Sequence, residues 1–130
     1  MERKPKVLLI DDDEQLLKLM KIYFSNSGLV PVTACSGKKG IKLFASEKPD
    51  VVVLDIMMPE MNGIDVCRIL RAKMGFRAVP IIAFTAYNKE EIKKEILEAG
   101  ASLFLLKGID MGTLVQHVKS FIPTEVPGVP

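Results

Sequence analysis

The chain has 130 residues and a formal net charge of +2; hydrophobic residues make up 48% of it and charged residues 26%. That length suits one domain with a single core, and the composition is that of a globular chain rather than a disordered one. The small, evenly spread charge gives no footprint for nucleic-acid binding, and no apolar run approaches the roughly 20 residues that a membrane span needs.

The two cysteines, Cys35 and Cys67, lie far apart in the chain and form no C-x-x-C pair. Free thiols in a reducing compartment are the expectation for such a pattern. Together with the composition, this predicts a soluble cytoplasmic protein that contacts neither a membrane nor nucleic acid directly.

Apolar runs alternate with amphipathic stretches along the chain. The apolar runs predict strands at Val7–Ile10, Val30–Ala34, Val51–Leu54, Pro80–Phe84 and Leu103–Leu106. The amphipathic stretches predict helices at Glu14–Ser25, Lys38–Glu47, Ile64–Lys73, Lys89–Ala99 and Met111–Ile122. Three of the runs are almost unbroken, as in parallel strands that are covered on both faces. Five strand–helix units therefore predict an α/β fold with right-handed crossovers.

Polar side chains follow four of these strands, at the carboxyl ends where open parallel sheets bind ligands. They are Asp11, Asp12 and Asp13 after the first strand, Asp55 after the third, Thr85 after the fourth and Lys107 after the fifth. Because the carboxyl ends of parallel strands share one edge of the sheet, we expect these groups to lie close together.

Carboxylates that crowd together repel one another and need a counter-charge, for which a divalent cation is suited. Two or three carboxylates completed by carbonyls and water suit Mg²⁺ better than a fully protein-caged Ca²⁺. A metal beside Asp55 would help its carboxylate attack a phosphoryl group. Lys107 supplies a positive charge for the phosphoryl oxygens, and the Thr85 hydroxyl supplies a hydrogen-bond donor.

Four segments closely resemble the receiver domains of two-component response regulators, of the chemotaxis-regulator type. They are VLLIDDDE, LDIMMPEMNG with proline four and glycine eight residues after its first aspartate, FTA, and AGASLFLLK. The resemblance covers about residues 4–122 and leaves residues 123–130 as a flexible tail or the start of a linker. It implies a flavodoxin-like three-layer sandwich, with a five-stranded parallel sheet of order 2-1-3-4-5 and five helices.

The resemblance also implies roles for individual residues. Asp55 is the expected phosphoacceptor, Asp11 and Asp12 are the expected metal-binding acids, and Met57 would offer its backbone carbonyl to Mg²⁺. Thr85 and Lys107 would sense the phosphoryl group. Phe104, three residues before Lys107, falls at the family's switch aromatic, although such a ring is also a common core residue.

The partners implied are a sensor histidine kinase or a histidine phosphotransfer protein, and a downstream effector or an output domain. Recognition, or a homodimer, would use the surface of the fourth helix, fifth strand and fifth helix. The charged run KEEIKKE in that region could equally be a solvated helix face. A switch of this kind is no enzyme toward other substrates, since it promotes only its own phosphorylation and dephosphorylation.

The chain departs from the family pattern at Gly108, where the family usually has proline after a cis peptide bond. A cis bond without proline costs on the order of 3 kcal/mol, so we predict a trans bond and a rearranged loop. Tyr87, two residues after Thr85, occupies a variable position, and its ring would restrict water access to the phosphoryl group.

Simpler or competing interpretations apply to several residues. Asp13 fits a helix N-cap or a solvated acid, and His117, the single histidine, fits a structural or exposed residue. An aspartate-nucleophile phosphatase would need a second acid at Met57, and a flavin carrier would need a glycine-rich loop where DDDE stands. A degenerate receiver that acts as a constitutive protein-binding module remains the alternative, because of Gly108.

Overall fold

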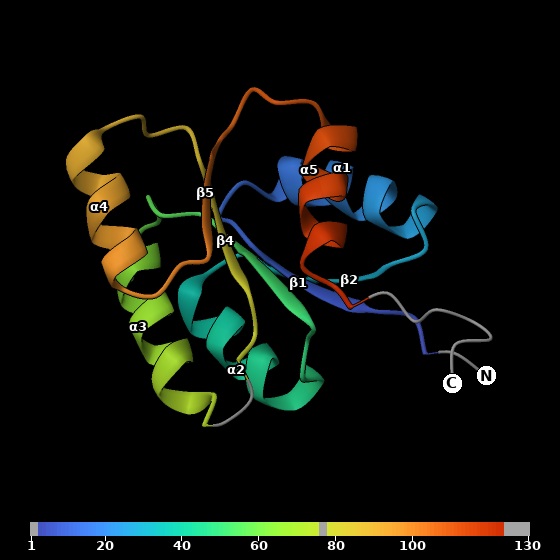
Figure 1. Ribbon diagram of the computed structural model, residues 1–130, viewed down its shortest axis with the longest axis horizontal. Helices are drawn as coiled ribbons and strands as arrows, with labels where there is room; N and C mark the ends of the chain where they lie inside the picture. The colour runs from blue at the N-terminus through green and yellow to red at the C-terminus, as the bar shows by residue number, and fades with distance from the viewer. Residues whose placement is uncertain (1–2, 76–77, 124–130) are drawn as a thin grey trace.

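The computed structural model describes residues 3–75 and 78–123. Strands and helices alternate in it as β1 (Lys6–Ile10), α1 (Glu14–Asn26), β2 (Val30–Ala34), α2 (Gly37–Glu47), β3 (Val51–Leu54), α3 (Gly63–Lys73), β4 (Ile81–Thr85), α4 (Glu90–Glu98), β5 (Leu103–Leu106) and α5 (Met111–Ser120). The strands form one parallel sheet in the order β2-β1-β3-β4-β5 (Figure 1). The predicted α/β sandwich and its strand order are therefore confirmed.

Both faces of the sheet are covered by helices, which explains the unbroken apolar runs of its central strands. Helices α1 and α5 lie side by side on one face, and α2, α3 and α4 cover the other (Figure 1). Successive strand residues point to opposite faces, so Leu8 and Ile10 of β1 join the core under α2 and α3, whereas Val7 and Leu9 join the core under α1 and α5. The apolar sequence of β1 therefore feeds two separate cores.

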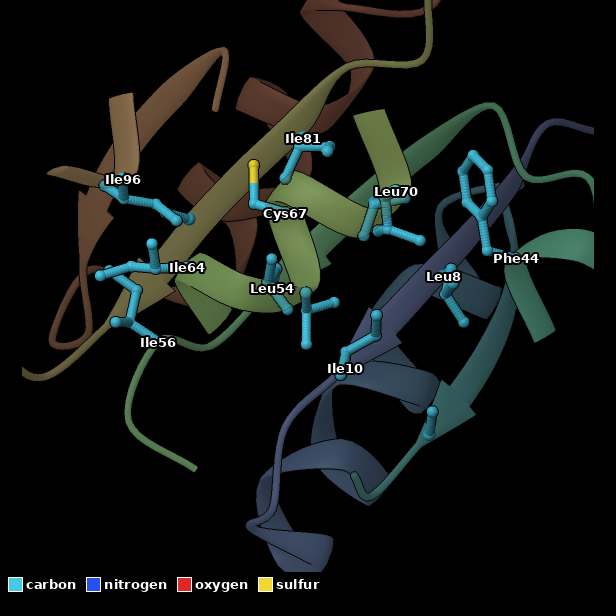
Figure 2. Close-up of a cluster of buried hydrophobic side chains, with 14 of the residues drawn as sticks. Leu8, Ile10, Phe44, Leu54, Ile56, Ile64, Cys67, Leu70, Ile81 and Ile96 are labelled. Carbon is cyan, nitrogen blue, oxygen red and sulfur yellow. The ribbon is translucent and has the colours of Figure 1, made fainter. Parts of the chain in front are cut away.

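The core under α2, α3 and α4 supports the segment that follows β3. Figure 2 shows side chains from the sheet meeting Phe44 of α2, Leu70 of α3 and Ile96 of α4. Ile56, directly after Asp55, is fully buried in the same core. The burial of Ile56 therefore holds in place the chain immediately after β3, including Asp55.

Several element bounds differ from the predicted ones by one or two residues; β1, for example, begins at Lys6 rather than Val7. β4 begins at Ile81 rather than Pro80 and includes Thr85, because proline lacks the N–H of a ladder donor while its carbonyl still accepts from the Val52 N–H at 2.9 Å. α5 ends at Ser120, with Phe121 as its C-cap. Of the predicted tail, residues 123–130, all but residue 123 lie outside the described residues.

Other predictions from composition can be compared with the structure. Both cysteines are free thiols, as predicted; Cys35 is exposed and Cys67 is buried. His117 lies half-buried in the last turn of α5. Among the described helices, none is long and apolar enough to cross a membrane.

Candidate functional site

The backbone places two carboxylates next to each other at the carboxyl edge of the sheet. The Asp55 N–H donates to the Ile10 carbonyl at 2.9 Å, and the Asp11 N–H donates to the Ala34 carbonyl at 3.1 Å. These bonds extend the parallel ladders one residue past β3 and β1. Asp11 and Asp55 are therefore held on adjacent strands rather than on mobile loops.

Asp11, Asp12 and Asp55 form a carboxylate triad. Each offers an oxygen, and these oxygens all lie within 4.8 Å of one another. Asp11 and Asp55 are buried, whereas Asp12 is exposed and faces solvent at the rim. Three carboxylate oxygens with open access on one side are the hard donor set that Mg²⁺ takes in proteins, with water completing the coordination. The residues present therefore fit a magnesium ion.

Lys107 provides the positive charge that the sequence pattern places beside this triad. Its Nζ lies 2.8 Å from Asp11 Oδ2 and 3.5 Å from Asp55 Oδ2. Burial by itself lowers the pKa of Lys107, but the hydrogen bond and charge of Asp11, together with Asp55, outweigh burial and raise that pKa. Lys107 is therefore a fixed cation that bridges the two buried carboxylates.

Asp55 is the carboxylate that its surroundings perturb most clearly. Burial raises the pKa of Asp55 from 3.8 to about 6, and the charge of Asp11 adds to the rise. The charge of Lys107, the Ile56 N–H at 2.9 Å from Oδ1 and the Thr85 hydroxyl lower it only in part. A further cation would favour the ionised form. The excess of carboxylates over ammonium groups therefore favours binding of a cation next to Asp55, the residue expected to react.

Thr85 ends β4 with its side chain buried, at the same edge. The Thr85 hydroxyl accepts a hydrogen bond from the Tyr87 N–H at 3.2 Å, and it contributes a hydrogen bond to the Asp55 carboxylate. The Tyr87 ring is half-buried, with the Lys89 ammonium 5.7 Å from its centroid. One hydroxyl therefore connects Asp55 to the loop that leads into α4.

Gly63 packs against the backbone of Asp55 and Ile56, a contact that the sequence pattern did not predict. Its N–H donates to the Ile56 carbonyl at 2.7 Å. A Cβ at Gly63 would collide with the Asp55 backbone oxygen and would lie 2.7 Å from the Ile56 Cα. Asn62 caps the following helix by accepting from the Asp65 N–H at 3.1 Å. The only sequence signal for this close approach was the glycine itself, eight residues after Asp55.

The remaining predicted site residues lie around this centre. Met57 stands in the loop after Asp55 with its side chain half exposed, and the role of its carbonyl stays a prediction. Asp13 is the N-cap of α1, since its side chain accepts from the Gln15 and Leu16 N–H groups. Phe104 lies on β5, partly buried against the core on the α4 side, with the Lys93 ammonium 5.9 Å from its ring. The structure therefore places Phe104 outside the carboxylate centre, between the core and α4.

The segment after β5 agrees with the prediction made for Gly108. No peptide bond within residues 3–75 and 78–123 is cis, so the Lys107–Gly108 bond is trans. Gly108 has a φ of +119°. Lys107 nevertheless reaches both buried carboxylates, so this loop places the lysine at the centre without a cis bond.

Comparison with known proteins gives a family match over most of the chain. A family model described as the response regulator receiver domain matches residues 7–119. The Bacillus subtilis alkaline phosphatase synthesis transcriptional regulatory protein PhoP is 36% identical over 118 residues, which are 90% of this chain and 48% of that protein. The chain thus spans about half the length of the curated relatives it matches.

Two solved structures share both fold and sequence similarity with the chain. The receiver domain of the Francisella response regulator 1452 superimposes with a TM-score of 0.82 at 32% identity, over 91% of this chain and 96% of that one. A chain of the CheX–CheY–BeF3–Mg²⁺ complex from Borrelia burgdorferi gives a TM-score of 0.81 at 28% identity, over 89% and 87%.

Proposed function

This chain belongs to the response regulator receiver domain family of two-component signalling, and from that premise we propose that it is a Mg²⁺-dependent switch phosphorylated on Asp55. The phosphoryl group comes from a sensor histidine kinase or a histidine phosphotransfer protein. The observation that carries the proposal is the Lys107 ammonium between Asp11 and Asp55, at 2.8 and 3.5 Å, with the buried Thr85 hydroxyl beside them.

The residues divide the chemistry among them. A magnesium ion held by Asp11, Asp12 and Asp55, with the Met57 backbone carbonyl, would neutralise the phosphoryl oxygens. The ionised Asp55 oxygen attacks phosphorus while the bond from phosphorus to the donor nitrogen breaks, and the donor imidazole keeps that electron pair. Lys107 turns its ammonium from the two carboxylates to the phosphoryl oxygens, and Thr85 donates its hydroxyl hydrogen to one of them.

The acyl phosphate on Asp55 then biases the conformation of the α4–β5–α5 surface. Thr85 is the connection, because its hydroxyl already accepts from the Tyr87 N–H in the loop before α4. Near the C-terminal end of α4, Ile96 is buried in the core. At the N-terminal end of the helix, the N-cap residue Lys89 makes no side-chain capping bond. An uncapped helix start is less costly to shift. Phe104, packed between the core and α4, would change its position with this movement.

The same surface is the proposed site for a downstream effector, an output domain or a second copy of the chain. Leu97 is exposed on α4 beside Lys93 and Lys94, so apolar and charged groups stand together there. Residues 4–122 would form the receiver unit and residues 123–130 a tail or linker start. The proposed setting is the cytoplasm, with no direct contact to nucleic acid or membrane.

The test is incubation with a small acyl phosphate or phosphoramidate, with and without Mg²⁺, followed by intact mass spectrometry. Wild type gains one phosphoryl group only when Mg²⁺ is present, and Asp55→Asn gains none. Asp65→Asn, which removes an exposed acid of α3, is labelled like wild type. No labelling of wild type at saturating Mg²⁺ would contradict the proposal and favour a degenerate receiver that binds its partner constitutively.

A further inference from the structure

Lys107 leaves β5 between two anchored points. On one side, its own N–H donates to the Thr85 carbonyl at 2.7 Å, which ties it to the end of β4. On the other side, Asp110 caps α5, because its side chain accepts from the Thr113 N–H at 2.7 Å and from the Thr113 hydroxyl at 3.0 Å. Ile109 packs against the core under α1 and α5. Between these anchors only Gly108 has a positive φ.

Gly108 adopts a backbone angle that other residues avoid. Its φ of +119° lies well beyond the left-handed helical region near about +57° that some other residues visit. A Cβ built at Gly108 meets no atom within 4 Å. Room is therefore available for a side chain, and it is the backbone angle alone that requires glycine here.

We propose that Gly108 is a positioning residue for Lys107, an inference that rests on the proposed function of Asp55. Its positive φ lets the chain turn into α5 while the Lys107 ammonium stays 2.8 Å from Asp11 and 3.5 Å from Asp55. Any residue that moves φ to a negative value must rotate the chain next to Lys107 or break an anchor at Thr85 or Asp110.

Proline makes the inference specific to this chain. Its ring fixes φ near about −65°, which is incompatible with the angle at Gly108. A proline here would therefore misplace the lysine while the bond from Lys107 stays trans, as it is in this structure; the family's usual proline follows a cis bond instead. Since a misplacement of about 1 Å can cost roughly a hundredfold in rate, we expect phosphorylation to slow by about tenfold or more in Gly108→Pro.

The experiment measures the rate of phosphorylation by a small acyl phosphate at saturating Mg²⁺ for Gly108→Ala and Gly108→Pro. The matched control is Gly28→Ala, because Gly28 also has a positive φ (+83°) and open space around it, but lies between α1 and β2. Thermal unfolding of each variant shows whether it is folded. We expect both Gly108 variants to react about tenfold slower or worse, and the control to react like wild type.

Combined substitutions test whether Gly108 acts through Lys107. The double variant Lys107→Ala/Gly108→Ala should be no slower than Lys107→Ala alone, because the lysine that Gly108 positions is already gone. Multiplied losses in the double variant, or wild-type rates in Gly108→Ala, would overturn the inference.

A second readout separates this inference from the proposed function. Reductive methylation of Lys107, quantified by peptide mass spectrometry, requires no phosphorylation. In wild type the ammonium is held between the carboxylates with 23% of its side chain exposed, so it should react slowly, and in Gly108→Ala it should react faster, as an exposed lysine does. Unchanged methylation in Gly108→Ala would overturn the inference even if Asp55 is phosphorylated. Failed labelling of wild type would instead count against the proposed function.

Discussion

Two charged clusters lie at opposite edges of the sheet and differ in how their charges are balanced. At the amino edge, Arg71 of α3 donates to the Val79 carbonyl at 2.6 Å, to the Gly100 carbonyl at 2.8 Å and to the Ser102 hydroxyl at 3.2 Å. We call this the Arg71 cluster. At the carboxyl edge, the triad and Lys107, here the acidic cluster, set three carboxylates against one ammonium.

The difference separates a charge that stabilises the fold from charges for which we propose a binding role. The Arg71 guanidinium donates to uncharged oxygens, and these hydrogen bonds connect α3 to the segments that precede β4 and β5. In the acidic cluster, burial and the neighbouring charge of Asp11 raise the pKa of Asp55 to about 6, so its ionisation opposes folding. Perturbed groups of this kind concentrate at functional sites. Removing charge should therefore have opposite effects on stability at the two edges.

The largest effect on stability is expected at the Arg71 cluster. Arg71→Met removes hydrogen bonds from a charged donor and leaves half-buried carbonyls without it, so the free energy of unfolding should fall by about 4 kcal/mol. Chemical denaturation measures this change. The control is Arg68→Met on the same helix, whose exposed guanidinium lies 3.6 Å from Asp65 and should contribute less than about 0.5 kcal/mol. Equal losses in both variants would contradict the role assigned to Arg71.

The next effect is a pH-dependent gain from Asp55→Asn. With a folded-state pKa of about 6 against an ordinary 3.8, the folded protein binds the Asp55 proton more tightly than the unfolded chain. Below about pH 4, Asp55 is protonated in both the folded and the unfolded state and does not lower the free energy of unfolding. Between about pH 4 and pH 6 its ionisation lowers the free energy of unfolding increasingly, and above pH 6 the loss reaches about 3 kcal/mol.

Denaturation of wild type and Asp55→Asn in a chelator, from pH 4 to pH 8, checks this expectation. The stability gained by the variant should grow as pH rises and then level off above about pH 6. Added Mg²⁺ should reduce the gain by stabilising wild type. A stability gain that does not change with pH would show that folding does not raise the pKa of Asp55.

The smallest effect on stability is expected at the exposed member of the acidic cluster. Asp12→Asn relieves repulsion near solvent and should stabilise the protein by less than about 1 kcal/mol, while calorimetric titration should show weaker Mg²⁺ binding. The control is Asp13→Asn, which removes the same charge at the neighbouring residue, while asparagine remains a good N-cap for α1. Equal loss of Mg²⁺ affinity in both variants would indicate a general charge effect rather than a ligand role for Asp12.

The acidic cluster could be predicted from the sequence, whereas the Arg71 cluster could not. Asp11, Asp55 and Thr85 each stand where an apolar run ends, and parallel strands bring those ends to one edge. Arg71 bonds to backbone carbonyls of loops 8 and 29 residues away in the chain, and a carbonyl leaves no mark in a sequence. The same reason hid the contact of Gly63 with the Asp55 backbone.

The fold was predictable because apolar runs report burial directly. The strand bounds were confirmed except at β1, which begins one residue earlier, at Lys6, and at β4, where Pro80 contributes a carbonyl but no N–H. The trans bond at Gly108 followed from the energy of non-proline cis bonds, but the φ of +119° depends on where Thr85 and Asp110 anchor the loop. Angles set by two distant anchors require the three-dimensional structure.

The most direct measurement is the position of the acyl phosphate. After reaction with a small phosphodonor and Mg²⁺, reduction with borohydride converts a phosphorylated aspartate to homoserine, which peptide mass spectrometry locates. The account predicts homoserine at position 55 alone, and none when Mg²⁺ is chelated. Homoserine at position 11 or 12, or at position 55 without any divalent cation, would contradict it.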